Sequence, residues 1–169
     1  MKTAIVYYSM HGNVRYVAEK VAKGLGADLI ELKPVKAYPD KGAMQFIWGG
    51  SAVTFKKKPD LEPYSFNASD YELVIIGTPV WASNFTPPLR TFFENNDLTG
   101  KKIAVIATSA GGDSAKCLQA VKEAAHAESL GASLSLIDPK DKPSEDVEKK
   151  ISGFIEACKA LESSGFSLI

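Results

Sequence analysis

The first apolar run of the chain leads into a short polar loop with the composition of an anion-binding site. After Ala4–Tyr8, the loop Ser9–Asn13 brings a hydroxyl, an imidazole, a glycine and an amide, and a helical pattern begins at Val14. The N–H groups of such a loop and of the first helical turn point at one spot, where the helix dipole favours negative charge. The loop lacks the glycine and lysine spacings of dinucleotide and nucleoside triphosphate sites. It therefore predicts a site for a single phosphate monoester, unless Asn13 only caps the helix and Ser9 only closes the turn.

Two further loops offer groups that suit a flat ring. Gly77–Pro88 holds Trp81 in a stretch stiffened by three prolines, and Thr108–Asp113 places two adjacent glycines before a helical pattern. A tryptophan can stack on a ring, and glycines let backbone N–H groups approach a ligand closely. The alternatives are that Trp81 packs on a neighbouring helix and that Asp113 caps one.

Hydrophobic patterning places these loops on an alternating α/β chain. Near-continuous apolar runs, typical of strands buried on both faces, alternate with helical patterns. The expected strands are Ala4–Tyr8, Leu29–Leu32, Leu73–Ile76, Ile103–Ala107 and Leu134–Ile137. The expected helices are Val14–Leu25, one that begins at Pro87 after an N-cap at Thr86, Asp113–Ser129, and Val147–Leu161.

This alternation predicts a doubly wound α/β fold, with one parallel sheet, right-handed crossovers and helices on both faces. Five strands fit the order 2-1-3-4-5 better than a six-stranded dinucleotide fold. Ligands of such sheets bind at the carboxyl ends of the strands, where the strand order reverses, and the three loops above meet there. No repeat or boundary divides the chain, so a single domain over residues 1–169 is expected.

The connection Lys33–Asp70 is too long to be a structureless loop in a compact domain. Its apolar residues predict a short helix over Gly42–Gly50, with Phe46 and Trp48 as local core. The remainder, up to Pro63, is expected to be irregular and to lie against the sheet edge.

Composition excludes several classes of function. The net charge is zero, so the chain has no electrostatic footprint for nucleic acid or for an anionic membrane, and Lys56–Lys58 is interpreted as a solvated loop. No stretch approaches membrane length and no leader precedes the first strand. Cys117 and Cys158 fall at apolar helical positions, which predicts core thiols in a reducing compartment, the cytoplasm. Two histidines cannot complete a zinc site at these spacings.

In its phosphate-type loop the chain resembles the short-chain members of the flavodoxin family. Ser9, Gly12 and Asn13 match the family's loop, whereas His11 and Val14 stand where the family usually has threonine. The lost hydroxyls remove two candidate hydrogen bonds, and the imidazole of His11 can offset part of that loss.

The other two loops extend the resemblance over roughly the whole chain. Gly77–Pro88 is similar to the family's Gly-Thr-Pro-x-Trp loop, and Thr108–Gly112 is similar to its third flavin loop. The resemblance implies non-covalent FMN and electron transfer between redox partner proteins. The residues expected to contact FMN are Ser9, Met10, His11, Gly12, Asn13, Val14, Thr78, Pro79, Val80, Trp81, Ala82, Ser83, Asn84, Phe85, Ser109, Ala110, Gly111, Gly112 and Asp113. Ala82 stands where relatives bear glycine, and alanine resists a positive φ.

Two other functions remain open on the same fold. An FMN-dependent NAD(P)H:quinone or nitro-compound reductase would need room for a second flat substrate, which Phe46 and Trp48 would then line. A signalling receiver or a small phosphatase is disfavoured, because the first loop lacks the acidic residues or the cysteine that those proteins need.

Overall fold

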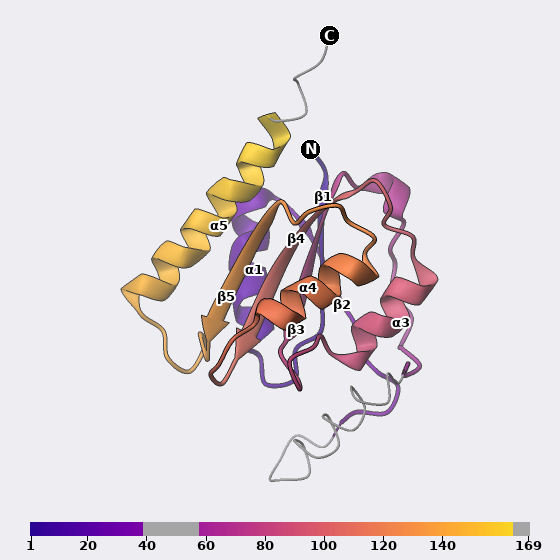
Figure 1. The fold of residues 1–169 in the computed structure, drawn as a ribbon, viewed down its shortest axis with the longest axis horizontal. Helices are drawn as coiled ribbons and strands as arrows, with labels where there is room; N and C mark the ends of the chain where they lie inside the picture. The colour runs from indigo at the N-terminus through magenta and orange to yellow at the C-terminus, as the bar shows by residue number, and fades with distance from the viewer. Residues whose placement is uncertain (39–57, 164–169) are drawn as a thin grey trace.

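The computed structural model describes residues 1–38 and 58–163. Within them, five parallel strands form one sheet in the order β2-β1-β3-β4-β5, which confirms the predicted topology (Figure 1). The strands are β1 Thr3–Tyr7, β2 Asp28–Glu31, β3 Leu73–Pro79, β4 Lys102–Ser109 and β5 Ala132–Ile137. The helices are α1 Asn13–Leu25, η1 Ala68–Asp70 (a 3₁₀ turn), α3 Pro87–Asn95, α4 Ala115–Ala124 and α5 Glu145–Ser163.

Helices cover both faces of the sheet, and alternate strand residues feed two separate cores. Helices α1 and α5 pack on one face, over Ile5, Ile75 and Ile106 among others. Helices α3 and α4 pack on the other face, over residues that include Val6 and Ile76. Strands buried on both sides explain the near-continuous apolar runs in the sequence.

Helix α4 is shorter at both ends than expected. Its N-cap is Ser114 rather than Asp113, whose carboxylate instead accepts the Ala115 N–H at 2.8 Å. The helix stops at Ala124 because His126 takes a left-handed φ of 54° and the Ala127 N–H returns to the Lys122 carbonyl. This is a Schellman-type ending built without glycine, so no glycine marks it in the sequence.

The described ends of the long connection after β2 are tied to each other. An antiparallel bridge joins Pro34 and Leu61, and the Thr91 hydroxyl of α3 donates to the Pro59 carbonyl at 2.7 Å. The predicted helix over Gly42–Gly50, with Phe46 and Trp48, lies outside the described residues, as do Lys56 and Lys57.

Both cysteines occupy the core, as predicted. Cys117 and Cys158 are free thiols with no exposed surface, and burial raises the pKa of each to about 12. They therefore stay protonated and unreactive. No helix in residues 1–38 or 58–163 is both long and apolar enough to span a membrane.

A glycine on β3 lets α1 begin close to the sheet. A Cβ at Gly77 would lie 2.8 Å from both Tyr7 Cβ on β1 and Val14 Cγ1 on α1. Real Cβ atoms essentially never lie this close to another heavy atom. The absence of a side chain at Gly77 therefore sets how closely the first turn of α1 approaches β1 and β3.

Gly77→Ala tests this constraint. Overpacking against Tyr7 and Val14 should lower the free energy of unfolding by about 1–3 kcal/mol, measured by urea denaturation. Gly153→Ala in α5 is the matched control, because nothing lies within 4 Å of its added Cβ. A helical alanine there should raise stability by about 0.5–1 kcal/mol. Equal effects of the two substitutions would refute the close-approach argument.

Candidate functional site

The loop between β1 and α1 directs backbone donors into one place. Gly12 is the N-cap of α1 with φ 91°, a left-handed conformation that favours glycine. Ser9 Oγ accepts the Arg15 N–H at 3.2 Å and so does the work of a helix cap. In the described part of the chain, the N–H groups of Gly12, Asn13 and Val14 meet no acceptor. These orphan donors, at the positive end of the helix dipole, form a cradle for an anion.

Asn13 does not cap α1. Its Oδ1 accepts the backbone N–H of Lys140 at 3.0 Å, and this hydrogen bond joins the loop to the segment after β5. The interpretation of Asn13 as a simple cap is therefore wrong.

A pocket of about 240 Å³ opens beside this cradle, at the carboxyl ends of β1, β3 and β4. This is the predicted switch point of the sheet. That volume includes the open solvent in front of the lining residues. The lining residues are Ser9, Met10, His11, Asn13, Val14, Pro79, Trp81 and Thr108.

Trp81 lies at this pocket and belongs to a cluster of three aromatic rings. Its ring centroid is 5.9 Å from that of Tyr8 and 5.4 Å from that of Tyr38, and the ring pairs are edge-to-face. Tyr8 and Tyr38 also meet edge-to-face at 6.0 Å. Trp81 is thus fixed by aromatic contacts and presents part of its ring to the pocket.

The two tyrosines that pack on Trp81 are buried and do not themselves line the pocket. Burial raises the pKa of Tyr38 to about 12 and raises that of Tyr8 further still. Both phenols therefore stay neutral at physiological pH. The sequence analysis did not identify Tyr38 as a neighbour of Trp81, because Tyr38 belongs to the long connection and has no local motif. Tyr8 was easier to place at the site, since it directly precedes Ser9.

A tight turn carries Trp81. Trp81 and Asn84 exchange two backbone hydrogen bonds of 3.0 Å, and the residues between them, Ala82 and Ser83, have φ of 50° and 63°. Two positive φ values are the signature of a type I′ turn, which favours asparagine and glycine. Ala82 is therefore held in a strained conformation.

Two residues of the predicted set have side chains that lie inside the protein. Thr78 is fully buried, and its hydroxyl accepts the Thr86 N–H at 3.1 Å and donates to the Pro79 carbonyl. Phe85 packs in the core edge-to-face on Phe93, with a 5.4 Å centroid separation. Their side chains support the loop rather than line the pocket.

Thr108 is the residue of the third loop that lines the described pocket. Thr108 reaches the pocket, and its carbonyl accepts the Val80 N–H at 2.8 Å. Ser109 offers its carbonyl to the Asp138 N–H. The next four residues are exposed and do not line the pocket: Ala110, Gly111, Gly112 and Asp113.

The remaining predicted residues belong to the loop that carries Trp81 and do not line the pocket. Val80 is half-buried against the core under α3, and Ala82 and Ser83 are exposed at the tip of the turn. Asn84 Oδ1 accepts the Phe85 N–H at 2.8 Å.

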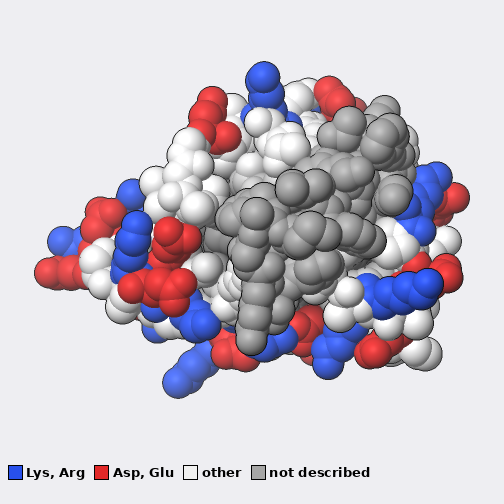
Figure 2. Space-filling view, turned by 90° about the horizontal axis from the view of Figure 1, so that it is seen from below, with Lys and Arg blue, Asp and Glu red and all other residues white. Residues whose placement is uncertain are grey.

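The surface around the site carries mixed charge. Figure 2 shows the face below the sheet in the view of Figure 1, where Lys or Arg and Asp or Glu side chains alternate around the rim. In residues 1–38 and 58–163, no group of His, Cys, Asp or Glu side chains is arranged to hold a metal ion. The described site is thus an anion cradle beside an aromatic ring.

Comparisons with known proteins give the family and the fold of this chain. A sequence model of the flavodoxin family matches residues 2–132. A flavoprotein from Lactobacillus acidophilus in complex with FMN is similar in structure, with a TM-score of 0.65, 23% identity, and coverage of 83% of this chain and 95% of the other. Oxidised Flavodoxin 2 from Bacillus cereus gives a TM-score of 0.61 at 20% identity, covering 93% and 97%. Two-electron reduced flavodoxin from Megasphaera elsdenii gives 0.57 at 16%, covering 92% and 98%.

Ala82→Gly tests the strain in the turn. Glycine adopts a positive φ without the steric penalty of alanine, so the variant should be more stable by about 0.5–1 kcal/mol in urea denaturation of the flavin-free protein. Ala110→Gly is the control, an exposed loop alanine without a positive φ, and should lose about 0.5 kcal/mol. If Ala82→Gly were destabilised as much as the control, the turn would be unstrained.

Proposed function

Because the chain belongs to the flavodoxin family, we propose that it binds FMN non-covalently and carries electrons between redox proteins. One observation carries this proposal: the cradle at the start of α1 and the ring of Trp81 line the same pocket at the switch point of the sheet. A phosphate at one end and a flat ring at the other is the chemistry of FMN. The FMN complex of the similar Lactobacillus acidophilus flavoprotein supports this choice.

The residues at the pocket fit the two ends of FMN. The N–H groups of Gly12, Asn13 and Val14 would hold the phosphate, because they lack acceptors in the described part and lie at the helix N-terminus. Trp81 would cover part of the ring, beside backbone groups of residues 78–85 and 109–113. FMN supplies one- or two-electron transfer when it is bound.

The chain's own contribution is placement and polarity. Trp81 lines the pocket, and the neutral phenols of Tyr8 and Tyr38 pack against it. The uncharged indole of Trp81 offers nothing to stabilise extra negative charge on a ring beside it, which favours a low reduction potential.

We propose redox proteins as partners and the cytoplasm as the compartment. The two buried free thiols fit a reducing compartment. The alternating charges in Figure 2 favour docking through a local patch rather than long-range steering.

The first test is cofactor identity and the role of Trp81. The purified protein should be yellow, and extraction should release FMN. Trp81→Ala should weaken both FMN and riboflavin binding by about ten- to a hundredfold, because the ring is common to both ligands, whereas Trp81→Phe should retain most of the affinity. Quenching of flavin fluorescence measures each Kd. A colourless protein that takes up no added FMN would overturn the proposed cofactor.

The second test separates a carrier from the alternative NAD(P)H:quinone reductase. The FMN-loaded protein should bleach only slowly with NADPH alone and quickly once an NADPH-dependent flavoprotein reductase is added, followed at the flavin absorbance band. Rapid oxidation of NADPH by the loaded protein alone, with quinone as acceptor, would favour the enzyme.

A further inference from the structure

The loop between β5 and α5 reaches across to the phosphate cradle. Lys140 forms two hydrogen bonds with the cradle: its backbone N–H donates to Asn13 Oδ1 at 3.0 Å, and its ammonium donates to the His11 carbonyl at 2.9 Å. Its stem lies 3.3 Å from the position that a Cβ would take at Gly12. A lysine 127 residues along the chain from Asn13 thus lies over the loop that would hold the phosphate.

The loop that presents Lys140 is anchored on both sides of it. The Asp138 N–H donates to the Ser109 carbonyl at 2.9 Å, and the Lys142 N–H donates back to the Asp138 carbonyl at 2.8 Å. Pro139 is buried, whereas the Lys140 side chain is exposed. The backbone therefore holds the base of this side chain while its ammonium remains open to a ligand.

The ammonium of Lys140 has capacity left after its contact with the cradle. An ammonium has three N–H donors, and the His11 carbonyl takes one of them. No carboxylate in residues 1–38 or 58–163 forms an ion pair with Lys140. Nearby Lys142 differs, because its ammonium lies 3.6 Å from Asp138 Oδ2.

We propose that Lys140 is a phosphate-binding residue that makes the site select phosphorylated flavin. The inference rests on the proposed FMN function and adds to it a side-chain cation that complements the backbone donors at the start of α1. A phosphate monoester carries a charge of about −1.5 to −2 at pH 7, and a hydrogen bond between charged partners is stronger than one between neutral groups. A flavin without phosphate gains nothing from this lysine.

The test compares Lys140→Met with Lys142→Met, using FMN and riboflavin as probes. Both substitutions remove one positive charge from the same loop, and both leave the backbone N–H bonded to Asn13 unchanged. Lys140→Met should raise the Kd for FMN about tenfold at low salt, by less at about 0.5 M salt, and leave the Kd for riboflavin unchanged. Lys142→Met should stay within about twofold of the wild type for both ligands. Lys140→Arg, which keeps the charge, should stay within about threefold for FMN.

Inorganic phosphate gives a second readout on the flavin-free protein. It should raise the Tm of the wild type and of Lys142→Met, and should raise that of Lys140→Met less, because the anion binds the folded cradle more weakly there.

The outcomes separate the two proposals. Equal FMN affinity in the wild type and Lys140→Met, or equal losses for FMN and riboflavin, would overturn the role of Lys140 and leave FMN binding intact. A wild type that binds neither flavin would overturn the proposed function, and the role of Lys140 with it.

Discussion

The close approach of helix α1 to the sheet is the constraint on which the candidate site depends. With no side chain at Gly77, the first turn of α1 rests directly on β1 and β3, the two strands between which the order reverses. The orphan N–H groups of that turn then face the edge where β3 and β4 also end. A bulkier residue at Gly77 would displace the helix, and the donors would no longer share a pocket with the loop after β3.

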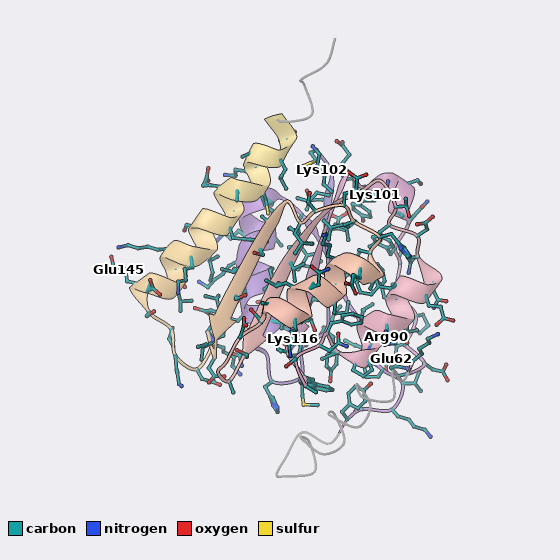
Figure 3. The ribbon with its side chains drawn as sticks, in the orientation of Figure 1. Glu62, Arg90, Lys101, Lys102, Lys116 and Glu145 are labelled. Atoms are coloured by element: carbon teal, nitrogen blue, oxygen red, sulfur yellow. The ribbon has the colours of Figure 1, made fainter. Side chains whose placement is uncertain are left out.

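In the loop that carries Trp81, buried side chains support the backbone and the more exposed ones face the pocket or solvent. The fully buried hydroxyl of Thr78 accepts the N–H of Thr86 at the start of α3, and Phe85 anchors the returning chain in the core. Figure 3 shows the position of this helix, with its residue Arg90 labelled. Between these anchors the chain has one exposed turn, so Trp81 is presented at a position that the core determines.

Local patterns predicted the strands and the three loops, because an apolar run and the start of a helix can be recognised from neighbouring residues. The strand order followed from the alternation of five strands with helices. The partner of Asn13 was not predictable in this way. An amide at the start of a helix suits a cap as well as a distant N–H, and only the folded chain brings Lys140 to it. The supporting roles of the Thr78 hydroxyl and the Phe85 ring were not predictable for a similar reason, since residues that support a loop and residues that bind a ligand have the same types.

The two ends of the site take their hydrogen bonds from different parts of the chain. The phosphate end is bonded to α1 and to the loop after β5, and the helix and strand that flank these bonds pack in the same core. The ring end depends on the turn of Ala82 and Ser83, whose positive φ values suit neither residue type. The site thus joins one end that is held by contacts between distant segments to another end that is held by a strained local turn.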